Sequence, residues 1–367
     1  MPLLSIGAGL VVLPASGELL IRGASACAAR LGVPPLVMGL TVVAFGTSAP
    51  ERVVSLDASL SGHADVAVGN VVGSNLANVL LILGLSAAAS PLVVSPRLLR
   101  WDLPWMVGAS AMLFFCARDG RISRGEGAAF VVLGLAYVAW SLRGIRLTRA
   151  AATTGGPAEV ARGARLHSAS LAGPAAAIAG GILGLAAGAH WLVAGAVAVA
   201  TLLGVPELVI GLTIVSVGTS LPELVASVMA SLRGEREIAV GNVVGSNLFN
   251  ILVVAGLSAV VAPQGLAVAE QALAVDLPAM VLAAAVCLPI FLSGLAVARW
   301  EGALLVGYYG IYLAWLAATS SGSPWAEILR QAVAWRLGPL TLVALAVSLV
   351  RSRLPSHSDA PRNDPPR

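Results

Sequence analysis

Ten long apolar segments follow one another along this chain, and polar residues gather in the short stretches between them. About 20 consecutive apolar residues are enough for a helix to cross the hydrocarbon layer of a membrane. The pattern therefore predicts an all-α polytopic membrane protein with ten core transmembrane helices. The predicted helices cover residues 3–30, 34–60, 66–89, 102–117, 125–142, 172–203, 206–232, 238–261, 270–292 and 300–318.

The chain contains a long internal duplication. Residues Gly46–Gly84 return at Gly218–Gly256 with a constant offset of 172 residues, and 24 of the 39 positions are identical. Such a long-period repeat indicates two copies of one structural unit. We expect a first five-helix repeat at 1–149, a cytoplasmic linker at 150–170 and a second five-helix repeat at 171–320. The apolar run Gln331–Val350, within 321–350, predicts an eleventh helix, and 351–367 is expected to be a disordered tail.

The distribution of arginine predicts how the repeats are oriented. Because five is an odd number of crossings, the second repeat should run through the membrane inverted relative to the first. With the N-terminus outside, eleven loop arginines would lie inside and three would lie outside, in agreement with the positive-inside rule. The inner group is Arg30, Arg97, Arg100, Arg143, Arg146, Arg149, Arg162, Arg165, Arg233, Arg236 and Arg299, and the outer group is Arg118, Arg121 and Arg124.

Composition excludes an ordinary soluble domain. Hydrophobic residues make up 58% of the chain and charged residues only 11%, whereas charged residues make up about 25% of soluble domains. The lipid bilayer is therefore an expected partner, nucleic acid is not, and the inner membrane of a bacterium is the expected location. No spacing of Cys and His suggests a metal centre, so we expect no cofactor. The sequence leaves the oligomeric state open.

Each repeat carries a proline and a glutamate inside its second apolar segment. Pro50 and Pro222 each remove a helical hydrogen bond and clash with the carbonyl four residues back, near Gly46 and Gly218. The motif therefore predicts two broken helices whose freed carbonyls line a cavity. An ionisable side chain at membrane depth is costly, which makes Glu51 and Glu223 candidates for a functional site.

Oxygen-bearing side chains recur at the same positions of both repeats. The candidate ligands are Thr47, Ser48, Glu51, Ser74 and Asn78 in the first repeat, and Thr219, Ser220, Glu223, Ser246 and Asn250 in the second. Hard cations such as Ca²⁺ and Na⁺ prefer oxygen ligands of these kinds, and two carboxylates match the charge of one Ca²⁺. The GxxxG glycines Gly69, Gly73, Gly241 and Gly245 are instead expected to pack helices closely.

These residues resemble the two α-repeats of the sodium/calcium exchanger family, particularly its prokaryotic members. The likeness rests on GTSAPE and GTSLPE, together with GNVVGSNLANVL and GNVVGSNLFNIL, and it covers about residues 1–320. It implies ten core helices in two inverted five-helix repeats. It also implies a central site formed by the second, third, seventh and eighth helices, with the same ten candidate ligands.

Two positions depart from the family pattern. Some members carry Asp where this chain has Asn250, so a third carboxylate is absent. Arg52 follows Glu51 where Leu is usual, as at Leu224 of the second repeat; Arg52 could pair with Asp57 or lower the cation affinity of the first half of the site. Away from the site, Asp102 and Asp276 precede Leu-Pro, which predicts that both are helix N-caps.

The sequence leaves three functions to be compared. An antiporter that exchanges Ca²⁺ for Na⁺ or H⁺ is favoured, because neutralisation of two glutamates by a cation would permit alternating access. A Ca²⁺/H⁺ exchanger would use nearly the same ligands. A passive cation channel is less favoured, and an intramembrane hydrolase least, because no Ser–His dyad or aspartate pair is evident. The chain is not expected to be an enzyme.

Overall fold

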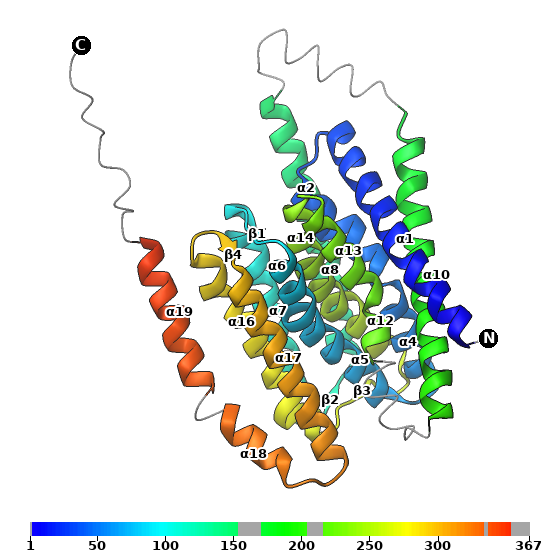
Figure 1. The fold of residues 1–367 in the computed structure, drawn as a ribbon, viewed down its shortest axis with the longest axis vertical. Helices are drawn as coiled ribbons and strands as arrows, with labels where there is room; N and C mark the ends of the chain where they lie inside the picture. Colours follow the sequence, from blue (N-terminus) through cyan, green and yellow to red (C-terminus); the bar gives the residue numbers. More distant parts are fainter. Residues whose placement is uncertain (1, 153–169, 204–215, 334–336, 354–367) are drawn as a thin grey trace.

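The computed structural model describes residues 2–152, 170–203, 216–333 and 337–353. They form a bundle of helices with two very small β-sheets at its edges (Figure 1). Seven helices of the described part are long and apolar enough to cross a membrane. They are Pro2–Leu31, Ala64–Ala89, Arg124–Arg143, Ala172–Leu202, Arg236–Val261, Ala272–Leu292 and Arg299–Ser320.

The first half of the chain contains five helical stretches, several of which are divided by π-helical turns. In chain order the elements are α1 (Pro2–Leu31), α2 (Pro35–Met38), η1 (Gly39–Val43), α3 (Ala44–Thr47), α4 (Ala49–Leu60), α5 (Ala64–Leu76), η2 (Ala77–Leu83), α6 (Gly84–Ala89), β1 (Leu92–Val93), η3 (Leu98–Asp102), α7 (Leu103–Cys116), η4 (Ala117–Asp119), β2 (Arg121–Ile122) and α8 (Arg124–Ala152).

The second half repeats this order. Its elements are α10 (Ala172–Leu202), α12 (Ser216–Thr219), α13 (Leu221–Leu232), α14 (Arg236–Phe249), η6 (Asn250–Ala255), α15 (Gly256–Val261), β3 (Leu266–Ala267), η7 (Ala272–Asp276), α16 (Leu277–Leu292), β4 (Ala296–Val297), α17 (Arg299–Ser320), α18 (Trp325–Ala332) and α19 (Gly338–Arg353). Most predicted segments match these bounds to within a few residues, although the stretch 206–215 lies outside the described residues. The exception is the segment 125–142, because α8 continues to Ala152 and so includes the first residues of the predicted linker.

The first helices of the two halves, α1 and α10, pack along one side of the bundle and run antiparallel (Figure 1). A Cβ on Gly9 would lie 2.8 Å from the carbonyl oxygen of Gly188, whereas a Cβ on Gly23 would lie 2.9 Å from that of Pro174. Residues later in α1 therefore contact residues earlier in α10, as expected for antiparallel helices. Close backbone approach of this kind needs residues without bulky side chains.

Short strands tie the two halves together outside the helices. β1 pairs antiparallel with β4, and β2 pairs antiparallel with β3, so each two-stranded sheet takes one strand from each half. Away from these strands, Glu18 on α1 forms ion pairs with Arg22 of the same helix, at 2.5 Å, and with Arg233 before α14. The halves are therefore joined at their ends as well as through their helices.

The run Gln331–Val350, for which one helix is predicted, is described in two parts, because residues 334–336 lie outside the described residues and the prediction of a single helix stays open. Gln331 belongs to α18, while α19 begins at Gly338 and contacts α16 (Figure 1). At 1.5 Å per residue, α19 with its 16 residues is about 24 Å long, shorter than a typical hydrocarbon core.

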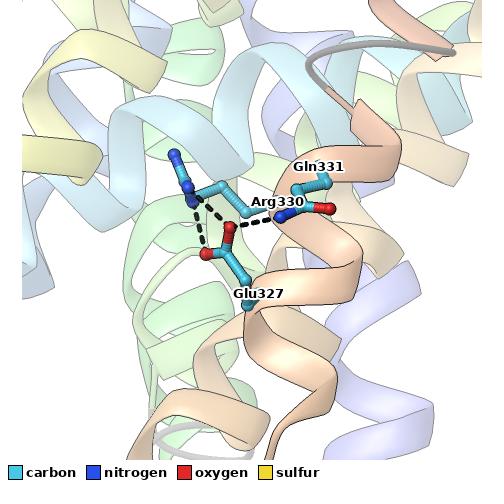
Figure 2. Close-up of polar contacts among 3 residues, drawn as sticks. All are labelled: Glu327, Arg330 and Gln331. Atoms are coloured by element: carbon cyan, nitrogen blue, oxygen red, sulfur yellow. Dashed lines mark hydrogen bonds and ion pairs between the residues drawn. The ribbon is translucent and has the colours of Figure 1, made fainter.

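Helix α18 is held by a local polar contact. Glu327 accepts hydrogen bonds from Arg330, at 2.8 and 2.6 Å, and from Gln331 at 2.7 Å (Figure 2). These donors favour the ionised carboxylate and lower the pKa of Glu327 to about 2. The side chain is exposed, so this contact orders one helical turn and adds little to the stability of the fold.

The predicted N-cap role of Asp102 and Asp276 is wrong. Both residues have helical backbone angles within continuous helices, and neither makes a side-chain cap hydrogen bond. Instead, Asp102 accepts a hydrogen bond of 3.0 Å from Tyr137, and Asp276 accepts one of 3.1 Å from Tyr312. A π-helical turn runs directly into the next helix at each position, so no free helix start is left to cap.

The packing role predicted for the GxxxG glycines is confirmed in the second repeat. Cβ atoms on Gly241 and Gly245 would lie 2.7 and 2.6 Å from the carbonyl oxygens of Leu36 and Leu40. These glycines let α14 lie directly against α2 and η1. For Gly69 and Gly73 the equivalent partners fall at residues 208–216, most of which lie outside the described residues, so that part stays a prediction.

Candidate functional site

Two helices are interrupted where the prolines predicted it. The first break is at Ser48, between α3 and α4, with backbone angles φ −75° and ψ 17°. The second is at Ser220, between α12 and α13, with φ −90° and ψ 8°. Pro50 and Pro222 then occupy the first turns of α4 and α13, where a missing N–H costs no hydrogen bond.

The two glutamates lie immediately after these breaks, in the first turns of α4 and α13. Each side chain is only 1% exposed. A helix N-terminus carries a partial positive charge, which favours the carboxylate form of an acidic side chain placed there. That partial charge does not replace full solvation, so a buried pair of carboxylates still needs cations or protons.

Hydrogen bonds cross between the two halves at this point. Ser220 donates to Oε1 of Glu51 at 3.2 Å, and its hydroxyl also lies 3.4 Å from that of Ser74. At the equivalent place, the hydroxyls of Ser48 and Ser246 lie 3.1 Å apart. The serine at each break thus meets the third transmembrane stretch of the opposite half. The two breaks therefore face one another in the middle of the bundle.

Two asparagines that the sequence analysis did not select hold the breaks in place. Asn70 donates to the carbonyl oxygen of Glu51 at 3.1 Å and to the hydroxyl of Ser55 at 2.8 Å. Asn242 makes the same pair of contacts with Glu223 and Ser227, at 3.4 and 2.9 Å. Both belong to the repeated sequence GNVVGSN, so their identity in the two halves was the available signal.

Asn242 has a further contact that links the halves. The hydroxyl of Thr47 lies 3.3 Å from Oδ1 of Asn242. A second pair of unselected asparagines, Asn75 and Asn247, point toward the sulfur atoms of Met280 and Met106, each at 3.5 Å. Asn250 donates to Oδ1 of Asn75 at 3.3 Å. These amides form a second layer of support around the breaks.

The ten sequence-predicted ligands are gathered at the centre to different degrees. Nine are buried, and Thr219 is half-buried. Hydrogen bonds join Ser48 with Ser246, Ser220 with Glu51 and Ser74, and Thr47 with Asn242. Asn78 and Asn250 lie in the π-helical turns η2 and η6, which are frequent at functional sites. No hydrogen bond joins Asn78 or the Glu223 carboxylate to the others.

Several buried oxygen atoms at the centre have no hydrogen-bond partner. They are Oε2 of Glu51, both carboxylate oxygens of Glu223, and the amide oxygens of Asn78 and Asn250. Buried polar atoms are nearly always satisfied in folded proteins, so each such group calls for a ligand or another explanation. Within the described residues no three His, Cys, Asp or Glu side chains cluster. The available chemistry is therefore that of an oxygen-lined site for a hard cation.

Of the two alternatives given for Arg52, the pairing with Asp57 is not formed. Asp57 is exposed, whereas the Arg52 guanidinium turns back across the first break and donates to the carbonyl oxygen of Phe45 at 2.5 Å. It also stacks over the Phe45 ring, with its central carbon 4.0 Å from the ring centroid. Residues five apart on a helix do not face each other, while the break exposes an acceptor nearby.

Comparison with known proteins agrees with this geometry. The fold and the paired helix breaks define a membrane exchanger of cations. The family model described as sodium/calcium exchanger protein matches residues 1–143 and 174–318, and the chain belongs to this family.

Relatives and solved structures extend the match over most of the chain. The sodium/calcium exchanger MaX1 of Methanosarcina acetivorans is 34% identical over 341 residues, covering 83% of this chain and 95% of the relative. The inner membrane protein YrbG of Escherichia coli is 39% identical over 262 residues, covering 70% and 78%. A structure of the sodium-calcium exchanger NCX_Mj, soaked with Na⁺ and Ca²⁺, superimposes with a TM-score of 0.73 at 27% identity, covering 85% and 97%.

Proposed function

We propose that this protein exchanges Ca²⁺ for Na⁺ or H⁺ at a single site between the two helix breaks. The observation that carries the proposal is the pair of buried carboxylates, Glu51 and Glu223, each just after a break and each with oxygen atoms that lack a partner. Two carboxylates offset the charge of one Ca²⁺. The serine, threonine and asparagine oxygens around them provide neutral ligands of the kind Ca²⁺ accepts.

The transport cycle follows from electrostatics. A site with two ionised glutamates is costly to carry through the interior of the membrane, whereas a cation-loaded site is close to neutral. Reorientation therefore occurs with cations or protons bound. Exchange becomes obligatory because the empty carrier does not return easily. Both ion pairs, Ca²⁺/Na⁺ and Ca²⁺/H⁺, fit this scheme, since a proton neutralises a glutamate as Na⁺ does.

The architecture that we propose for this cycle is two inverted five-helix repeats with the N-terminus outside. The antiparallel course of α1 and α10, which occupy equivalent places in the two halves, supports the inversion. The pairing of β1 with β4 and of β2 with β3 joins one strand from each half, which supports a two-fold arrangement of the halves. In inverted-repeat transporters the substrate lies near the midplane between the repeats, where alternating access is possible.

The decisive experiment measures Ca²⁺ flux in vesicles that contain the purified protein. Na⁺ and pH gradients are imposed separately, and the membrane potential is clamped with an ionophore. Antiport predicts that one of the two gradients drives Ca²⁺ uptake against its own concentration gradient. Uptake that needs Na⁺ would identify Ca²⁺/Na⁺ exchange, and uptake that needs only a pH gradient would identify Ca²⁺/H⁺ exchange. Ca²⁺ flux that ignores both gradients would falsify antiport and favour a passive channel.

A further inference from the structure

The two helix breaks differ at three positions that come together in space. The first break is surrounded by Phe45, Arg52 and Phe249. The residues at the equivalent positions of the other repeat are Val217, Leu224 and Ala77. The Phe45 and Phe249 rings meet edge to face, with centroids 5.6 Å apart, and Arg52 stacks on the Phe45 ring. The two copies of the repeat are otherwise similar, but only the first break has a cationic side chain stacked on an aromatic ring.

The Arg52 side chain is fixed in place by two contacts that reach across the break to Phe45. It starts on α4, and its guanidinium donates to a carbonyl oxygen and stacks on a ring of α3. Stacking over an aromatic face and a directed N–H bond suit the planar guanidinium and not the flexible ammonium of lysine. The residue is half-buried, and its second terminal nitrogen is buried without a hydrogen-bond partner.

The charge of Arg52 acts on the site although its side chain does not enter it. An arginine stays protonated in proteins, and this one interacts electrostatically with both Glu51 and Glu223. The two carboxylates contribute a charge of −2, and the positive charge of Arg52 brings the local net charge to −1. Repulsion by a fixed positive charge grows in proportion to the total charge of the cations that the site holds at one time.

We propose that Arg52 is a specificity-determining residue, a tethered positive charge beside the first half of the site that limits the total cation charge loaded together. One Ca²⁺, or two monovalent cations, leaves a local total of one positive charge. Three Na⁺ would raise it to two. Arg52 therefore disfavours the loading of a third monovalent cation and favours exchange of two monovalent charges for one Ca²⁺. This inference rests on the proposed function.

Equilibrium binding of ⁴⁵Ca²⁺ to the purified protein tests the proposal, with Na⁺ as the competitor. Arg52→Leu installs the residue of the second repeat, and we expect it to tighten Ca²⁺ binding on the order of 10-fold. We also expect Na⁺ to displace Ca²⁺ at lower concentration and with a steeper dependence on Na⁺ concentration. Leu224→Arg adds a charge at the equivalent place and should weaken Ca²⁺ binding by a similar factor.

Arg52→Lys separates charge from structure, since it keeps the charge and loses the directed contacts. It should bind Ca²⁺ within about threefold of the unmodified protein. If Arg52→Lys instead behaves like Arg52→Leu, or if Arg52→Leu leaves Ca²⁺ binding and Na⁺ competition unchanged, the proposal is overturned. If the unmodified protein binds Ca²⁺ and Glu51→Gln does not, the proposed location of the Ca²⁺ site is supported. The absence of any such binding would instead contradict the proposed function.

Discussion

Ser220, which forms the second helix break, donates a hydrogen bond of 3.2 Å to the carboxylate of Glu51, which follows the first break. The two residues are 169 positions apart in the chain. This contact shows that the breaks of the two halves meet, and that a serine of one half helps to stabilise the glutamate of the other. The candidate site is therefore shared between the halves and cannot form within either one.

Replacement of either buried glutamate should abolish Ca²⁺ transport. Glu51→Gln and Glu223→Gln keep the side-chain shape but remove one of the two charges that balance Ca²⁺. We expect at least a 100-fold loss of uptake in vesicles, equivalent to about 2.7 kcal/mol of lost stabilisation. Asp57→Asn is the control, because Asp57 lies exposed on the same helix α4 as Glu51. Near-normal uptake by either glutamine variant would show that the site lies elsewhere.

Loss of the Asn242 amide should destabilise the folded protein and reduce Ca²⁺ transport. Asn242→Ala removes the contacts at 2.9 Å to Ser227 and 3.3 Å to Thr47 and leaves buried polar atoms unpaired. A cost of about 1–3 kcal/mol is expected for such a change, measured as a lower thermal unfolding temperature in detergent. Asn70→Ala removes the equivalent contacts to Glu51 and Ser55 in the first half and should also lower the unfolding temperature. Equal unfolding temperatures for Asn242→Ala and the unmodified protein would contradict this role.

Close packing of α14 makes Gly245 intolerant of a side chain. A Cβ there would meet the carbonyl oxygen of Leu40 at 2.6 Å, and backbone atoms cannot move aside cheaply. Gly245→Ala should therefore destabilise the protein and displace the adjacent Ser246. Gly180→Ala on α10 is the matched control, because its Cβ would meet only Leu19 at 3.4 Å. Thermal unfolding of both variants should show a clear loss for the first and little change for the second.

A third carboxylate at position 250 should strengthen cation binding. Asn250→Asp adds a negative charge beside an amide, Asn75, whose present donor contact is only to the Met280 sulfur at 3.5 Å. That amide can turn and donate to the new carboxylate at small cost. We expect Ca²⁺ affinity to rise on the order of 10-fold, together with a stronger dependence on pH, since the new group binds protons as well. Unchanged affinity across pH would mean that charge does not limit binding.

Reporter fusions test the predicted topology. The arginine distribution places the 150–170 linker in the cytoplasm, and an eleventh crossing by α19 would place the end of the chain there too. A reporter inserted near residue 160 and one fused after Arg353 should then both give a cytoplasmic signal. A periplasmic signal after Arg353 alone would mean that α19 does not cross, in keeping with its length of 16 residues, and would leave the repeats intact.

The sequence by itself determined the features that depend on local chemistry. Proline at positions 50 and 222 removes a backbone donor wherever the chain goes, so the breaks at Ser48 and Ser220 could be predicted. The apolar run at 172–203 likewise predicted α10, which spans Ala172–Leu202, because hydrophobic length is a local property.

The tertiary structure decided which partner each polar group meets. Asp102 was expected at a free helix start, yet it lies in a continuous helix and binds Tyr137 on α8. Pairing with Asp57 was one of two alternatives for Arg52, yet its guanidinium crosses the break to Phe45. The support that Asn70 and Asn242 give to the breaks was not predicted at all. Such pairings depend on the neighbours and register of whole helices, which are set by packing between distant segments. The repeat shows that Asn70 and Asn242 are equivalent, but it does not show which groups they bind.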